Sequence, residues 1–226
     1  MIFSYTFLNT YGDICPEMCR RLYVLKDVKK TFSQKQDAGI DAHAVMDRHI
    51  RMGDSVPPEL EFAAGLVSAL RAHAEVSSEV ALAVDRALAP GRFLEKGSWM
   101  PWLRGKFDAV ALGRADGPSA DAAALAEWKT GKVRESGDQL EIGALLLMAR
   151  HPRIQKVTGF NVWVGARRVG QPFTFLRTQA GTLWAKWIRR MQEIEQKDAT
   201  RAWEKRESPL CAYCPVRECE NWMGGG

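Results

Sequence analysis

The strongest constraint in this sequence is an apolar run, residues 122–126, that ends by placing a carboxylate and an ammonium group side by side, in Glu127 and Lys129. The run is typical of a buried β-strand, in which residues i and i+2 project from the same face. A charged pair at the end of such a strand has two interpretations. It is either a surface ion pair, contributing about 0–1 kcal/mol, or a hard-cation site with the ammonium close to the reacting atom.

A second predicted strand supplies a partner for Glu127. Residues 104–113 alternate in polarity like a strand, and the turn-rich stretch 113–121 joins them to the strand that ends at Lys129. Together these segments predict a β-hairpin with a long turn. Its neighbouring strands would bring Asp108 and Glu127 together at one sheet edge. Such a carboxylate pair can hold Mg²⁺ or Mn²⁺, while the ammonium activates water or stabilises charge on a phosphoryl oxygen.

Hydrophobic periodicity predicts the remaining elements. Helical spacing covers residues 16–28, 38–52, 59–74, 139–149 and 179–205, strand-like patterns cover 156–165 and 172–178, and residues 79–84 fit either a strand or a short helix. The chain thus runs from helices to a strand hairpin, a buried helix, further strands and a final helix. This order predicts a mixed α/β core with a helical N-terminal part.

Composition limits the class of protein. A length of 226 residues with 46% apolar side chains is ordinary for one globular domain with a substantial core. No apolar run reaches the 18 or more residues of a membrane span. The N-terminus has neither the basic start nor the apolar stretch of a secretory signal, so we expect a cytoplasmic protein. A formal net charge of +5 mildly favours a polyanionic partner such as nucleic acid.

The combination of Asp108 with the later string E-W-K-T-G-K, residues 127–132, resembles the core of the PD-(D/E)XK nucleases. The resemblance is to their RecB-like branch, which includes CRISPR-associated and phage exonucleases. Members of that branch carry a G-x-x-D strand followed by a strand that ends in D/E-x-K-T-G-K. Here residues 105–108 read G-K-F-D, so both motifs are present in the expected order.

Two further motifs of this branch lie outside the hairpin. A metal-binding histidine lies in an upstream helix, often shortly after a glycine, and Gly39 and His43 fit this pattern. A Q-x-x-x-Y helix lies downstream, where Gln139 fits but the tyrosine position is Gly143. This departure leaves open the DNA contact that the missing ring would make. It does not affect the metal site.

The five cysteines are confined to the two ends of the chain. An odd number without an export signal argues against a disulfide framework. Residues 4–24 resemble the start of RecB-like nucleases in which one N-terminal and three C-terminal cysteines hold an iron–sulfur cluster, so the implied ligands are Cys15, Cys211, Cys214 and Cys219. Four thiolates suffice for a [4Fe–4S] cluster or for tetrahedral zinc, and the one-plus-three layout favours iron–sulfur. Cys19 lies one helical turn after Cys15, so either of these two can face the metal.

The resemblance implies a restriction-endonuclease-like fold, in which a mixed α/β sheet core is flanked by helices. We therefore expect a single nuclease domain over residues 1–226. Its helical N-terminal part would cover residues 1–75 and its catalytic α/β core residues 76–207. A Cys-rich tail, residues 208–226, would pack with the N-terminus.

The resemblance also implies a function, which is metal-dependent hydrolysis of DNA phosphodiester bonds. An exonuclease acting on single strands or DNA ends in recombination, repair or DNA processing is the expected form. The implied catalytic residues are Asp108, Glu127, Lys129 and Gln139, and the implied Mg²⁺ or Mn²⁺ ligands are His43, Asp108, Glu127 and the main-chain carbonyl of Trp128. The expected partners are DNA and, as an option, a second copy of the chain or a recombination or repair protein, with no membrane.

Other interpretations stay open at this level. Glu79 fits an additional acidic residue near the metal ions or a solvated side chain, and Trp99 and Trp102 fit base stacking or core packing. The chain also fits a nucleic-acid-binding or assembly protein that cuts poorly and keeps a structural iron–sulfur or zinc site. A zinc-stapled protein with no nucleic-acid role is the third interpretation.

Overall fold

The computed structural model describes residues 1–29, 34–53, 55–73, 75–95, 97–113 and 119–224, with only the backbone described for residues 34–42. Contacts divide the chain into two compact units. One unit consists of Met1–Phe32 and Ala185–Gly226, and the other of Ser33–Trp184. None of the described helices is both long enough and apolar enough to cross a membrane.

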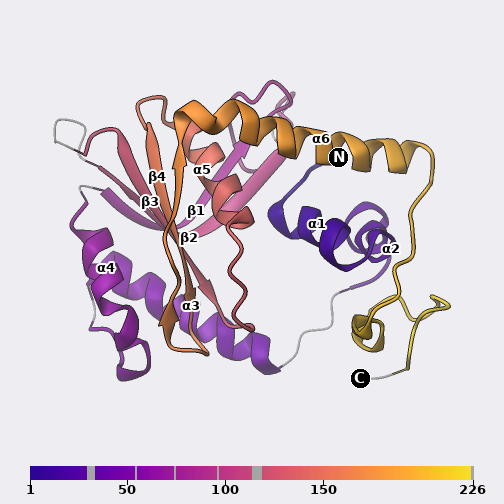
Figure 1. Cartoon of the computed structure of the whole chain (residues 1–226), viewed down its shortest axis with the longest axis horizontal. Helices are drawn as coiled ribbons and strands as arrows, with labels where there is room; N and C mark the ends of the chain where they lie inside the picture. Colours follow the sequence, from indigo (N-terminus) through magenta and orange to yellow (C-terminus); the bar gives the residue numbers. More distant parts are fainter. Residues whose placement is uncertain (30–33, 54, 74, 96, 114–118, 225–226) are drawn as a thin grey trace. The chain divides into compact units, whose positions relative to one another are not determined.

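The unit Ser33–Trp184 is built on a mixed sheet (Figure 1). Its described strands are β1 (Glu75–Val84), β2 (Leu103–Leu112), β3 (Ala122–Lys129), β4 (Lys156–Trp163), β5 (Arg168–Val169) and β6 (Phe173–Leu176). β1, β2 and β3 are antiparallel neighbours, β3 and β4 are parallel, and β5 and β6 each pair antiparallel with β4. The expected mixed α/β core and the β2–β3 hairpin are confirmed, although most of the turn, residues 114–118, lies outside the described residues.

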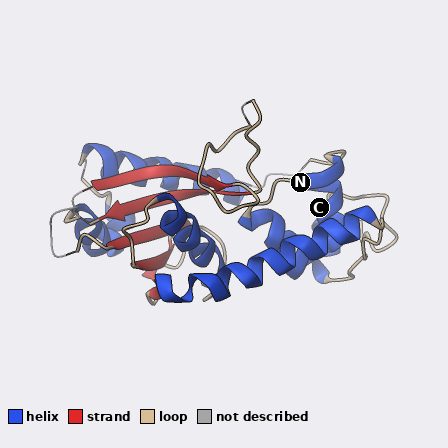
Figure 2. Ribbon diagram, turned by 90° about the horizontal axis from the view of Figure 1, so that it is seen from above, coloured by secondary structure: helices blue, strands red, loops and turns tan. Residues whose placement is uncertain are grey.

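Helices cover both faces of this sheet (Figure 2). α3 (Gln34–Met52), the 3₁₀ helix η3 (Pro58–Ala63) and α4 (Ala64–Arg71) pack on one face, and α5 (Asp138–Arg150) packs on the other. The first group forms an apolar cluster with small buried side chains of β2 and β3, namely Ala109, Ala111, Ala124 and Ala126. α5 connects the parallel strands β3 and β4, which need a long crossover rather than a tight turn.

The alternation of side chains along β2 changes phase at Asp108. Phe107 lies against α5, where its ring is the nearest side chain to Gly143. Ala109, two residues later, belongs to the apolar cluster with α3 and α4 on the other face. In an undisturbed strand residues 107 and 109 would share a face. The phase change occurs beside Glu79 of β1, whose φ of 55° lies in the left-handed region.

The unit formed by the two chain ends is mainly helical. It contains α1 (Tyr5–Asn9), the π-helical segments η1 (Thr10–Ile14) and η2 (Arg20–Leu25), α2 (Pro16–Cys19), the 3₁₀ helix η5 (Pro209–Tyr213) and the part of α6 (Ala180–Ala199) that follows Trp184. The hydroxyl of Tyr11 donates to Glu193 of α6 at 2.8 Å. Burial is the largest cause of a raised pKa for the Tyr11 phenol, and this hydrogen bond is the second. The N-terminal segment and α6 are thus joined by a partly buried polar contact.

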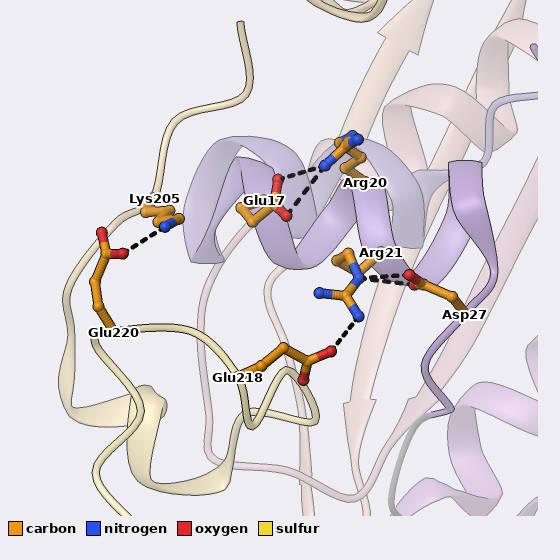
Figure 3. Close-up of polar contacts among 7 residues, drawn as sticks. All are labelled: Glu17, Arg20, Arg21, Asp27, Lys205, Glu218 and Glu220. Carbon is orange, nitrogen blue, oxygen red and sulfur yellow. Dashed lines mark hydrogen bonds and ion pairs between the residues drawn. The ribbon is translucent and has the colours of Figure 1, made fainter. Parts of the chain in front are cut away.

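An ion pair also links the N-terminal helices of this unit to its C-terminal tail (Figure 3). Arg21 binds Glu218 of the tail at 2.5 Å and Asp27 of its own segment at 2.7 Å, and Lys205 binds Glu220 within the C-terminal segment at 2.6 Å. Exposed pairs of this kind each contribute about 0–1 kcal/mol. They therefore orient the tail more than they stabilise it.

The last helix is shorter than the sequence predicts. α6 ends at Ala199, whereas the amphipathic pattern predicted a helix over residues 179–205, so that boundary was wrong. Arg201 has a φ of 54°. The N–H of Ala202 donates to the carbonyl of Lys197, and the N–H of Arg201 donates to that of Asp198. This is the hydrogen-bond pattern of a Schellman C-cap, which ends a helix whatever apolar pattern follows.

Other boundaries also differ. Residues 79–84 belong to strand β1, which settles the choice between strand and helix. The helix expected over residues 59–74 is a 3₁₀ helix for its first part and an α-helix only from Ala64 to Arg71. Pro57 is the N-cap of η3 and Pro58 its first residue, where proline removes no intrahelical hydrogen bond, so these prolines fix where the segment begins.

Candidate active site

Asp108 lies between two other carboxylates on neighbouring strands. The ladder between β1 and β2 includes Ser78 and Val80 but skips Glu79, whose register position faces Asp108. The ladder between β2 and β3 stops one residue short of Asp108, and the same register continued would pair it with Glu127. A left-handed residue other than glycine costs about 1–2 kcal/mol, and such strain is concentrated at functional positions. The left-handed backbone at Glu79 therefore points to this part of the sheet as a functional site.

His43 reaches the same place from α3. Its Nδ1 lies 3.1 Å from Oδ1 of Asp108. The hydrogen bond to Asp108 raises the pKa of the His43 imidazole, against the opposing effect of burial. Ligand atoms of His43, Glu79 and Asp108 all lie within 4.8 Å of one another. Side chains from one helix and two strands thus converge on a volume that suits one cation.

The main chain of Trp128 also borders this site. Its N–H donates to Oδ2 of Asp108 at 2.7 Å, which fixes the carboxylate. A backbone hydrogen bond with Trp128 contributes to the raised pKa of His43. The indole side chain of Trp128 is buried in the apolar cluster with α3 and α4. The main chain of Trp128 therefore lies at the site, and its side chain anchors the strand.

Glu127 is buried, with only 3% of its surface exposed. Burial raises the pKa of its carboxyl group to about 8, the nearby charge of Asp108 acts in the same direction, and Lys129 acts against them. Its Oε2 accepts from Lys129 at 3.4 Å and from the amide of Gln139. Its Oε1 is buried and has no hydrogen-bond partner among the described residues. A buried oxygen without a partner is costly unless something else satisfies it.

Gln139 joins the two members of the opening pair. It lies in the first turn of α5, donates through Nε2 to Glu127 and accepts from the ammonium of Lys129 through Oε1. Both amide functions are therefore used. The pair of Glu127 and Lys129 is part of a hydrogen-bonded triad and not a solvent-exposed salt bridge.

Gly143, at the tyrosine position of the Q-x-x-x-Y pattern, faces the sheet. A Cβ at this position would lie 2.7 Å from Cε1 of Phe107 and 2.8 Å from Cδ1 of Leu125. Real Cβ atoms essentially never approach other atoms so closely, so α5 sits nearer to β2 and β3 than a side chain at 143 would permit. A tyrosine ring therefore does not fit here without a shift of the helix.

The residues at this site fit a divalent cation. The donor set of one imidazole and several carboxylates consists of nitrogen and oxygen ligands, which Mg²⁺ and Mn²⁺ accept. The partnerless Oε1 of Glu127 and the close approach of His43, Glu79 and Asp108 are each explained by a bound ion. Lys129 supplies a fixed positive charge next to them.

A family model decides which kind of protein carries this arrangement. A model of the PD-(D/E)XK nuclease superfamily matches residues 3–219, which is most of the chain. The chain belongs to the PD-(D/E)XK nuclease superfamily. Members are generally metal-dependent nucleases that use divalent ions such as Mg²⁺, and membership implies DNA as the substrate. No curated protein sequence matches the chain.

Four of the cysteines in this PD-(D/E)XK chain line one pocket in the unit formed by the chain ends. They are Cys15, Cys211, Cys214 and Cys219. Burial raises the pKa of the Cys214 thiol, and the charges of the other three act in the same direction. Cys19 does not line this pocket, because it is buried and its Sγ donates to the carbonyl of Phe7 at 3.4 Å.

Further contacts hold the residues of this candidate metal site in place. Asp47, one turn after His43 on α3, accepts a hydrogen bond from Ser78, which precedes Glu79 in β1. Lys106 of β2 forms an ion pair with Glu79. These contacts were not predicted, because nothing local in the sequence relates residues of β1 to residues of α3 or β2. The sequence did not decide between two roles for Glu79, and the structure places its carboxylate with His43 and Asp108.

The tryptophans that the sequence left open have different environments. Trp102 is 4% exposed and lies beneath the guanidinium of Arg86, so core packing holds for it. Trp99 is half-buried, and its indole N–H donates to the carbonyl of Arg92 at 2.8 Å. Gly39, part of the upstream histidine motif, lies in the segment for which only the backbone is described.

Proposed function

We propose that this chain is a metal-dependent deoxyribonuclease that acts as an exonuclease on single-stranded DNA or DNA ends. The observation that carries the proposal is the convergence of His43, Glu79 and Asp108 beside the buried Glu127 and its partner Lys129. Cation ligands next to a fixed ammonium suit the hydrolysis of a phosphodiester. Recombination, repair and related DNA processing are roles that would use such an activity, and they rest on analogy.

The residues that would hold Mg²⁺ or Mn²⁺ are His43, Glu79, Asp108, Glu127 and the carbonyl of Trp128. A bound ion at this place would polarise a phosphoryl oxygen and lower the pKa of a water molecule. Lys129 has a separate role, which is to stabilise negative charge that develops on the phosphate. Gln139 keeps this ammonium and the Glu127 carboxylate in fixed positions through its two amide functions.

We further propose that Cys15, Cys211, Cys214 and Cys219 hold a [4Fe–4S] cluster, with zinc as the alternative metal. Their common pocket supports this, as does the contact of Cys19 with Phe7, which directs that thiol elsewhere. A metal bound by all four thiolates would join the N-terminal segment to the C-terminal tail. Its binding free energy would add to the folding free energy of this unit.

A protein that binds or organises nucleic acid but cuts poorly is the second candidate. Gly143 favours it, because the chain lacks the tyrosine that the family pattern places there. A single nuclease domain over residues 1–226, a cytoplasmic location and a protein partner or second copy stay predictions.

The test compares cleavage with binding in Asp108→Ala and Lys129→Ala. Each change should reduce Mg²⁺- or Mn²⁺-dependent cleavage of single-stranded DNA by at least about 100-fold, since Asp108 would hold the metal ion and Lys129 would stabilise charge on the phosphate. Binding of the same DNA in EDTA, followed by fluorescence anisotropy, should change by no more than a few-fold. Glu59→Gln is the matched control, because Glu59 is an exposed carboxylate on η3.

Two results would contradict the proposal. Unchanged cleavage in both variants would place the activity elsewhere. Salt-sensitive DNA binding without any metal-dependent cleavage by the unmodified protein would favour the second candidate.

A further inference from the structure

A second concave site lies on the sheet that carries the metal-site residues. It has a volume of about 500 Å³, which is within the range of about 300–1,000 Å³ typical of small-ligand sites. Its lining consists of Ala81, Leu82, Ala83, Gly91, Arg92, Phe93 and Arg150. Among these described lining residues there are two arginines, one aromatic ring and no carboxylate. Such a surface suits a ligand that has both a negative charge and a flat apolar face.

The loop that forms one wall of this site is held by specific contacts. The indole of Trp99 donates to the carbonyl of Arg92 at 2.8 Å, and Arg104 donates to the carbonyl of Phe93 at 3.1 Å. The guanidinium of Arg104 also lies 4.8 Å from the centre of the Phe93 ring. A Cβ at Gly91 would overlap the Trp99 ring, so only glycine permits this approach. The wall is therefore preorganised, which lowers the entropic cost of binding.

The position of the site relates it to the metal residues. Glu79 and the floor residues Ala81 and Ala83 lie on the same strand, β1. At a rise of about 3.3 Å per residue, Ala81 lies about 7 Å and Ala83 about 13 Å along the strand from Glu79. A nucleic-acid strand advances about 3.4 Å per nucleotide in a duplex and farther when it is extended. The separation along β1 thus corresponds to a few nucleotides of such a strand.

We propose that this site binds one nucleotide of the single-stranded DNA substrate, a few positions from the phosphate that is cleaved. Arg92 and Arg150 bind the phosphate, and Phe93 contacts the base. This inference rests on the proposed nuclease function and specifies its substrate, because a base can reach the ring only when it is unpaired. Bases stack on aromatic rings with little sequence preference, so the subsite selects single strands and not a sequence.

The test measures the affinity of a fluorescein-labelled oligothymidine in EDTA over a range of salt concentrations. Arg92→Gln combined with Arg150→Gln should lower the affinity and reduce the slope of log K against log salt by about 0.7 for each lost phosphate contact. Phe93→Leu should lower the affinity at least about fivefold without changing that slope, because stacking is not ionic. Lys156→Gln is the control, since it removes one exposed positive charge at the start of β4.

A readout of the metal site separates this inference from the proposed function. Hydrolysis of bis(p-nitrophenyl) phosphate, which is too small to span both sites, should be unchanged in the Arg92, Arg150 and Phe93 variants and lost in Asp108→Ala. Arg92→Gln alone carries the test if the Arg150 variant does not fold, because Arg92 lies on an exposed loop.

Three outcomes would overturn the inference. Wild-type affinity and salt slope in the arginine variants would show that the site does not contact DNA. An equal loss in Lys156→Gln would show a general charge effect. Tight binding of thymidine monophosphate that does not affect the binding of oligothymidine would show that this is a site for free nucleotides and not for a DNA strand. Each of these three outcomes leaves the nuclease function standing, provided that the unmodified protein cleaves DNA and Asp108→Ala does not.

Discussion

The surroundings of the Glu127 carboxyl group disfavour its ionised form when no cation is bound. It is buried, one of its oxygens has no partner among the described residues, and its pKa is raised to about 8 from an ordinary value near 4.5. Between about pH 4.5 and about pH 8, the Glu127 carboxyl group stays protonated in the folded protein but is ionised in the unfolded chain. Stability from this group is therefore fully present below about pH 4.5 and is lost as the pH rises through about 8.

Glu127→Gln tests this titration directly. In EDTA, the melting temperature of the unmodified protein should fall relative to that of the variant as the pH rises from about 5 to about 8. The free-energy difference should change by up to about 1.4 kcal/mol per pH unit, which is the limit for one proton. Scanning calorimetry at several pH values measures it, with Glu59→Gln as a control that should follow the unmodified protein. A difference between Glu127→Gln and wild type that is constant with pH would contradict the raised pKa.

At the scale of elements, the approach of α5 to the sheet determines where Gln139 lies. Gly143, one turn after Gln139, lets the helix pack directly on Phe107 and Leu125. With this packing, a tyrosine ring at position 143 would collide with Phe107 and Leu125. A helix farther from the sheet would move Gln139 away from Glu127 and Lys129.

Gly143→Ala should therefore destabilise the protein even though alanine is the better helix former. Overpacking of this kind costs about 1–3 kcal/mol, which exceeds the gain of about 1 kcal/mol in helix propensity. Urea unfolding followed by circular dichroism measures the change. Gly65→Ala in α4 is the matched control, because no atom lies within 4 Å of a Cβ built there, and it should leave stability unchanged or raise it. Equal effects of the two substitutions would mean that α5 can move away from the sheet at little cost.

At the scale of the whole molecule, residues from both ends of the chain form one compact unit. Hydrogen bonds and ion pairs join them, among them Tyr11 to Glu193 and Arg21 to Glu218. Arg190 and Arg206 add hydrogen bonds to the carbonyls of Leu8 and Gly12. A metal held by the four pocket cysteines would contribute far more to this unit than its surface ion pairs do.

Cysteine substitutions test this assignment. Cys15→Ser should lose the metal and lower the melting temperature, whereas Cys19→Ser should keep the metal, because the Cys19 thiol is directed to the carbonyl of Phe7. Protein purified without oxygen is analysed for iron, sulfide and zinc, and for broad absorption near about 400 nm if a cluster is present. A result of one zinc and no iron would show that the four cysteines bind zinc and not an iron–sulfur cluster. Loss of metal in Cys19→Ser but not in Cys15→Ser would reverse the assignment of the N-terminal ligand.

The sequence by itself determined the features that depend on local periodicity. The two-residue period of a strand placed Glu127 and Lys129 side by side, and the turn-rich stretch after Asp108 predicted the hairpin that brings β2 next to β3. The buried helix α5 followed from its apolar content and length. These features could be predicted because backbone geometry repeats over a few residues, whatever lies elsewhere in the chain.

Only the tertiary structure decided the features that depend on partners distant in the sequence. Glu79 joins His43 and Asp108 through the left-handed backbone at position 79, which no sequence period reveals. Cys15 and not Cys19 lines the cysteine pocket because the rotation of a short helix is set by its packing. α6 ends at Ala199 because Arg201 adopts a left-handed conformation, although the apolar pattern continues. In each case a long-range contact or a single dihedral angle outweighs the local preference of the chain.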